Sequence, residues 1–110
     1  MSDNRLELLQ GTLDMLVLKV LSSSEMHGYG IARKIQEISE NVLKVEEGSL
    51  YPSLYRMEQK GWIESSWGFS DNNRRAKYYQ LTPTGQKQLF LETSSWEAIS
   101  LAITRVMQTA

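Results

Sequence analysis

Residues 62–83 read WIESSWGFSDNNRRAKYYQLTP, and the architecture follows from this segment and its flanks. Trp62–Phe69 contains β-forming residues, Ser70–Asn73 is dense in turn formers, and Ala76–Leu81 again has β character. The pattern predicts a hairpin of two strands with a polar, basic tip. A hairpin of this length is not stable alone in water, so it must pack on the helices that the rest of the chain forms.

The N-terminal segment has helical periodicity on two sides. Its helix is capped by Thr12 or begins earlier, near Leu6. Leu8, Met15 and Leu18 form a second apolar line, so the helix is either central to the fold or covered in part by a second subunit. The positions expected to face the core are Leu9, Leu13, Leu16, Val17, Val20 and Leu21.

A second helix is expected after residues 27–30, HGYG, which have the composition of a turn leading into a helix. Its apolar face carries Ile31, Ile35 and Ile38, and it ends near residues 39–41. Residues 42–45 could form a brief extended segment.

A third helix precedes the hairpin, with Leu50, Leu54 and Met57 on one face. It should end at Gly61, because glycine suits the C′ position. Pro52 is harmless only in a first turn, which favours Ser49 as the N-cap. The alternative is a helix that begins slightly earlier and is bent.

The last helix starts at Thr82-Pro83, an N-cap followed by proline at the first helical position, and runs to about Gln108. The order of elements predicts a mainly α-helical chain with a small β-hairpin. Residues 1–82 would form a winged helix-turn-helix domain that binds DNA, and residues 83–110 a long C-terminal dimerisation helix. Its seam would contain Leu89, Trp96, Ile99, Ile103 and Val106.

Composition sets limits on the function. The 110 residues suffice for one domain, and 41% apolar with 23% charged residues is typical of a globular protein. The absence of cysteine excludes disulfides and thiolate metal sites, and neither a secretory signal nor an apolar run of about 20 residues is present. We therefore expect a soluble, cytoplasmic protein with no membrane partner.

The net charge of −1 counts against DNA binding, but the basic residues are concentrated on the hairpin. Arg74, Arg75 and Lys77 lie within four positions, suited to a minor groove or to phosphates; the alternative is a solvated basic turn. In the third helix, hydroxyls and a guanidinium could reach base edges and phosphates, or simply form a hydrated face. The candidate DNA contacts are Tyr29, Ser49, Tyr51, Ser53, Arg56, Arg74, Arg75 and Lys77.

The sequence contains no recognisable pattern of catalytic residues. His27 is the single histidine and has no cluster of ligands or carboxylates near it in sequence, so a role at the helix start is expected. We expect no enzyme activity, no metal and no cofactor. A winged-helix module whose third helix binds a protein instead of DNA remains the alternative.

Trp96 lies on the seam of the last helix. It either packs in a dimer contact, or two Trp96 rings face each other and bind a flat aromatic ligand beside Met15, Thr93 and Ser100.

Four motifs resemble the PadR family of transcriptional regulators: LQGTLD at 9–14, HGYGI at 27–31, EGSLYPSL at 47–54 and RRAKYYQLT at 74–82. The similarity runs from about Leu8 to Met107, and the short length resembles a compact branch that includes a multidrug-responsive regulator. It implies a homodimer in which the C-terminal helix packs on the partner's first helix, and repression through the third helix and the wing. Residues 94–96 resemble the place of a pocket tryptophan. Glu46-Glu47 adds one acid, so base contacts are not transferred there.

Overall fold

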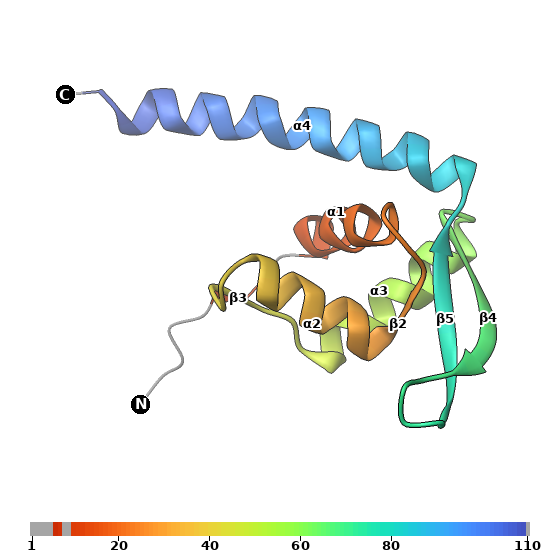
Figure 1. Cartoon of the computed structure of the whole chain (residues 1–110). Coiled ribbons are helices and arrows are strands. Elements are labelled where there is room, and N and C mark those ends of the chain that lie inside the picture. Colours follow the sequence, from red (N-terminus) through yellow and green to blue (C-terminus); the bar gives the residue numbers. More distant parts are fainter. Residues whose placement is uncertain (1–5, 8–9, 110) are drawn as a thin grey trace.

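The computed structural model describes residues 6–7 and 10–109. Four helices and short strands form a winged helix-turn-helix from which a long last helix extends, as Figure 1 shows. The elements are β1 (Leu6–Glu7), α1 (Gln10–Leu21), β2 (Met26–His27), α2 (Gly28–Ile38), β3 (Leu43–Lys44), α3 (Glu47–Gln59), β4 (Ile63–Phe69), β5 (Arg75–Leu81) and α4 (Pro83–Met107).

Helix α1 lies at the centre, between α4 on one side and α2 and α3 on the other (Figure 1). The predicted apolar face of α3 is confirmed, because Leu50, Leu54 and Met57 are buried. Ile63 of β4 and Tyr79 of β5 complete the core and hold the hairpin on the helices. From α1 the core receives Leu13, Val17, Leu18, Val20 and Leu21.

The predicted hairpin is confirmed and forms the wing. Strands β4 and β5 pair antiparallel from Ile63 opposite Leu81 to Phe69 opposite Arg75. The sequence did not indicate β2, which adds a third strand in the order β2-β5-β4. The short extended segment expected at 42–45 is β3, which pairs in parallel with β1.

Two helix boundaries lie at the start and stop residues that the sequence predicted. Gly61 ends α3 with a positive φ of 76°, and the N–H of Trp62 donates to the carbonyl of Met57 over 3.0 Å. This is the left-handed turn for which glycine has no steric cost. Thr82 caps α4, since its Oγ1 accepts from the N–H of Gly85 over 3.0 Å, with Pro83 at the first helical position.

The end of α3 and the start of α4 meet at one corner. Thr82 donates from its N–H to the carbonyl of Trp62 over 3.1 Å and from Oγ1 to the carbonyl of Gly61 over 2.6 Å. Gly85 packs so closely that a Cβ there would lie 1.9 Å from the Trp62 carbonyl oxygen. No side chain fits at this position without moving backbone, so the corner is tightly packed.

Three local predictions were wrong. Thr12 is not a cap, because α1 begins at Gln10, and Leu8 and Leu9 lie outside the described residues. Ser49 is not the N-cap of α3 either: the helix begins at Glu47, as the alternative of an earlier start allowed. Pro52 therefore lies inside the helix, where the carbonyl four positions before it belongs to an exposed residue that water can reach. Ile38 is 66% exposed because α2 ends there, beyond the core.

Candidate nucleic-acid interface

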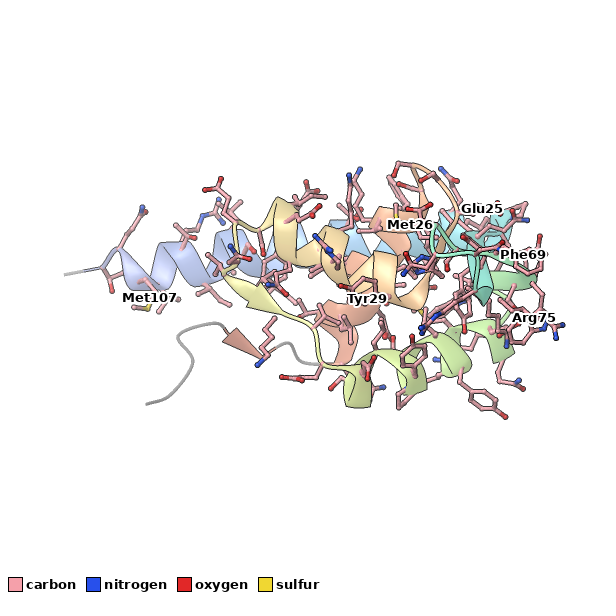
Figure 2. All side chains as sticks on the ribbon, turned by 60° about the horizontal axis from the view of Figure 1, so that its bottom comes forward. Glu25, Met26, Tyr29, Phe69, Arg75 and Met107 are labelled. Carbon is pink, nitrogen blue, oxygen red and sulfur yellow. The ribbon has the colours of Figure 1, made fainter. Side chains whose placement is uncertain are left out.

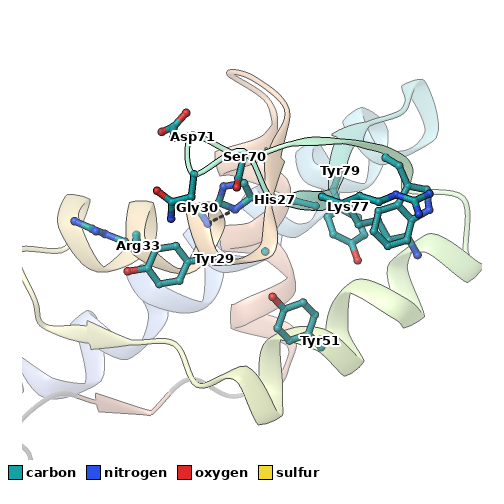
Figure 3. A pocket seen from close by; sticks show the side chains of 14 residues that line it. His27, Tyr29, Gly30, Arg33, Tyr51, Ser70, Asp71, Lys77 and Tyr79 are labelled. Atoms are coloured by element: carbon teal, nitrogen blue, oxygen red, sulfur yellow. Dashed lines mark hydrogen bonds between the residues drawn. The ribbon is translucent and has the colours of Figure 1, made fainter.

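A groove of about 720 Å³ separates the start of α2 from the wing, with one residue of α3 at its floor. Figure 3 shows that Tyr29 and Arg33 reach it from α2, Tyr51 from α3, and Lys77 from the wing. The groove is open and lined by hydroxyls, aromatic rings and cations, with Asp71 as the one carboxylate among the described residues that line it. Such a lining can hold a phosphate backbone and present donors to base edges.

His27 builds the α2 side of this groove. Its Nδ1 accepts from the N–H of Gly30 over 3.0 Å, so the side chain caps α2 (Figure 3). Its ring also meets Tyr78 edge to face, with the centroids 5.4 Å apart. This places His27 at the helix start, as the sequence analysis expected. Tyr29 follows directly and is 62% exposed.

Gly28 allows α2 and α3 to approach each other. A Cβ at this position would lie 2.6 Å from the hydroxyl oxygen of Tyr51. Tyr51 therefore packs across the first turn of α2 while keeping 44% of its surface exposed toward the groove.

Two predicted contacts on α3 belong to a buried cluster instead. Ser53 is 1% exposed, and its Oγ donates to Asp14 Oδ1 over 2.5 Å. The expectation that Ser53 lies on the exposed face is therefore wrong. Nη2 of Arg56 lies 2.6 and 2.7 Å from the two oxygens of the same Asp14 carboxylate. Arg56 is thus engaged by α1 and is not a free cation on the surface of α3.

The wing carries two adjacent exposed arginines, Arg74 and Arg75. The turn between its strands is closed by the N–H of Ser70, which donates to the carbonyl of Arg74 over 2.8 Å. The Arg75 guanidinium carbon stands 4.5 Å from the centroid of the Trp67 ring. Figure 2 shows Arg75 and Phe69 at the wing end of the molecule. Stacking leaves the arginine N–H groups available to an anion.

Lys77 is less free than the two arginines. Its Nζ lies 3.5 Å from Glu58 Oε1, which offsets part of its charge. Beneath it, burial raises the pKa of Tyr79, with Glu58 and Tyr51 adding to the effect. Tyr79 therefore stays neutral and contributes packing instead of charge.

A second groove, of about 430 Å³, lies between α1 and α4. Three residues of the predicted effector pocket, Met15, Thr93 and Trp96, line it, whereas Ser100 does not. Lys19 is the charged residue among those that line it.

The C-terminal half of α4 extends past the other helices, so its apolar side chains meet solvent (Figure 1). Along the predicted seam, the exposed fractions are 48% for Trp96, 53% for Ile99, 56% for Ile103 and 68% for Val106. Leu18 was placed in the same interface, and this is wrong, because it is fully buried in the core of its own chain. Leu89 is half-buried and packs against that core, and Leu8 lies outside the described residues.

The model of the transcriptional regulator PadR-like family matches residues 17–90, which is more than half of the chain. The chain belongs to the PadR-like family of transcriptional regulators.

Individual relatives agree with this membership. Transcriptional regulator Rv3488 of Mycobacterium tuberculosis is 30% identical over 84 residues, 76% of this chain and 75% of that protein. The crystal structure of a PadR-like regulator from Bacillus cereus is 31% identical, with a TM-score of 0.78 over 93% of this chain and 97% of that one. A PadR family regulator from Clostridium difficile is 30% identical, with a TM-score of 0.74 over 86% and 97%.

The exposed surface around the candidate interface includes residues that the sequence analysis did not name. Tyr55 is 67% exposed on α3, whereas its neighbour Arg56, which the sequence analysis named as a candidate contact, is held by Asp14. The helical spacing could have revealed that Tyr55 is exposed, since it shares a face with Pro52 and points away from the buried face that contains Leu54. Trp67 and Arg33 also line the groove, but no local pattern indicates that the wing and α2 enclose one space.

Within the described part of this PadR-like chain, no three histidine, aspartate or glutamate side chains gather closely enough to hold a metal ion. No helix among the same residues has the length and apolarity to cross a membrane.

Proposed function

We propose that this PadR-like regulator is a cytoplasmic homodimer that represses transcription by binding a pseudo-palindromic operator in double-stranded DNA. Helix α3 enters the major groove, and the wing contacts the neighbouring minor groove and phosphates. The observation that carries the proposal is the exposed pair Arg74 and Arg75 at the wing tip, beside the groove that Tyr29 and Tyr51 line.

The proposed contacts are fewer than the sequence suggested. Tyr29 and Tyr51 line the groove and offer hydroxyl groups, and Ser49 is exposed at the start of α3, outside the lining of the groove. Arg74 and Arg75 supply the main phosphate contacts, and Lys77 contributes less because Glu58 is close to it. With so few free cations, affinity depends on a small number of phosphate contacts, and this limits non-specific binding.

Dimerisation through residues 83–110 is the second part of the proposal. The apolar seam of α4 would otherwise leave large side chains such as Trp96 and Ile103 in water. In the dimer, α4 packs on α1 of the partner near Met15, while residues 1–82 bind DNA. A two-fold dimer recognises two half-sites about 10 base pairs apart, or a multiple of that distance.

A small aromatic compound bound near Trp96 releases the repressor from DNA in this scheme. The groove between α1 and α4 supports this idea, because Met15, Leu89 and Trp96 give it apolar walls and Thr93 offers a hydroxyl.

The DNA interface is tested by the salt dependence of binding. Duplexes are selected from random-sequence DNA by the wild-type protein, and Kd is measured by fluorescence anisotropy at several salt concentrations. Each arginine that neutralises a phosphate contributes about 1 to the log–log slope, so Arg74→Ala/Arg75→Ala should flatten it by about 2. Lys87→Ala, an exposed cation at the start of α4, is the matched control and should leave the slope unchanged. An unchanged slope in the double variant would remove the wing from the interface.

The dimer and the effector have separate tests. Sedimentation equilibrium should give a dimer at micromolar concentration, and a monomer would contradict the proposed interface. Planar aromatic compounds should quench the tryptophan fluorescence of the wild type and weaken its binding to DNA. In the Trp96→Phe variant, the same compounds should no longer quench the fluorescence. If no phenolic acid or cationic dye changes the signal of Trp96, its role is packing alone.

A further inference from the structure

The outermost stripe of α3 carries no charge. Gly48, Pro52, Tyr55 and Gln59 recur along the helix at spacings of four, three and four residues and are all exposed. They lie on the side of the helix opposite the buried Leu50, Leu54 and Met57.

Tyr55 dominates this stripe. Its side chain is 67% exposed, and among the described residues it makes no hydrogen bond, ion pair or ring contact. Pro52 lies three residues earlier on the same exposed face of the helix. The rings of Tyr55 and Pro52 form an exposed apolar surface on the helix that is expected to enter the major groove.

The cations of α3 and its C-cap are turned elsewhere. Arg56 is held by Asp14, and Nζ of Lys60 lies 4.6 Å from the centroid of the Trp62 ring. A guanidinium or ammonium on this face would recognise guanine through O6 and N7, and the stripe offers neither group.

Carboxylates are also absent from the stripe. Glu58 accepts a hydrogen bond from Ser65 over 2.6 Å and pairs with Lys77, so it faces the wing. Glu46 and Glu47 are confined to the start of the helix. The stripe therefore carries no charged group. Its polar groups are the amide of Gln59 at the C-terminal end of the helix and the hydroxyl of Tyr55, while the rings of Tyr55 and Pro52 suit an apolar feature of the groove.

The apolar feature that the major groove presents is the 5-methyl group of thymine. We propose that Tyr55, together with Pro52, contacts thymine methyl groups and is a specificity-determining residue of this regulator. The proposal rests on the DNA-binding function proposed above. It also uses continuity with that interface, since Tyr51 connects the same helix to the groove beside the wing.

The test removes the methyl group and the ring in turn. Each thymine of the duplex selected by the wild-type protein is replaced by deoxyuridine, and Kd is measured for the wild type, Tyr55→Ala and Tyr55→Phe. Loss of one buried methyl group should weaken wild-type binding about fourfold at the contacted position. At the position that Tyr55 contacts, Tyr55→Ala should bind the thymine and deoxyuridine duplexes equally, whereas Tyr55→Phe keeps the ring and should keep the difference.

Arg75→Ala is the matched control, because it removes a phosphate contact without touching α3. It should weaken binding to both duplexes by the same factor and retain the fourfold difference. Circular dichroism checks that the variants are folded, which we expect because Tyr55 is exposed.

The outcomes separate this proposal from the general function. If Tyr55→Ala remains as sensitive to deoxyuridine as the wild type, or if no thymine matters, the role of Tyr55 is refuted while DNA binding stands. If the wild type selects no duplex, both proposals fail.

Discussion

The cluster of Asp14, Ser53 and Arg56 predicts a large effect from one substitution. Arg56→Ala removes the guanidinium that lies 2.6 and 2.7 Å from the Asp14 oxygens, and leaves a carboxylate that is only 6% exposed. Breaking a buried ion pair by removing one partner costs about 3–5 kcal/mol. The side chain of Arg56 is 28% exposed, and its Nε is buried without a hydrogen-bond partner in the described structure. Both facts weaken the pair, so we expect Arg56→Ala to lower the free energy of unfolding by about 2–3 kcal/mol.

The assay is chemical denaturation followed by far-UV circular dichroism, at one protein concentration for all variants because association changes apparent stability. A cycle of Asp14→Asn, Arg56→Met and the double variant should give a coupling energy of about 1–3 kcal/mol. Arg33→Ala is the matched control. Arg33 pairs with Glu37 over 3.3 Å, but both side chains are more than half exposed, so its effect should be much smaller.

Two results would refute this reasoning. A loss below about 1 kcal/mol for Arg56→Ala would be typical of an exposed pair and would mean that Asp14 does not depend on the guanidinium. A decrease of about 1 in the salt slope of DNA binding, as expected for a wing arginine, would mean that Arg56 contacts a phosphate.

Three further predictions follow from glycine packing and from one buried phenol. Gly85→Ala should lower the free energy of unfolding by about 1–3 kcal/mol in chemical denaturation, because the new Cβ would collide with the Trp62 carbonyl; unchanged stability would contradict the packing. Gly28→Ala should weaken DNA binding at nearly constant stability, since the partly exposed Tyr51 ring can move but would leave the groove; unaltered Kd would count against Tyr51 as a contact. Burial raises the pKa of Tyr79, so stability should fall as the pH rises above about 10, where the phenol ionises first in the unfolded chain. The free energy of unfolding of Tyr79→Phe, measured by chemical denaturation, should fall less than that of the wild type at alkaline pH. If both proteins lose stability with pH at the same rate, the phenol is not buried.

The order of the main helices and the position of the hairpin were predictable because their causes are local. Gly61 and Thr82-Pro83 mark helix ends through their own backbone preferences, and the periodicity of α3 identifies its buried face. Strands β1 and β2 were missed because two residues are too few to show alternation, and each exists only through a distant partner.

The interface was predicted less well, because its residues are selected by contacts that are distant in sequence. Arg56 and Ser53 have the residue types of DNA contacts, but a carboxylate about 40 residues earlier engages both. Spacing along α3 gives no information about Asp14. Leu18 shows the same limit, since a second apolar line suggested a partner subunit where the chain's own core was sufficient.

The close contact between Gly85 and Trp62 has a consequence for how operators can diverge. Because α3 ends and α4 begins at this tightly packed corner, the separation of the two recognition helices in the proposed dimer would depend on how α4 packs on α1 of the partner. In the same proposal, the bases that are read depend instead on the outer side chains of α3. Half-site spacing and half-site sequence are then encoded in separate parts of the chain, so substitutions along the α4 seam can alter one while leaving the other intact.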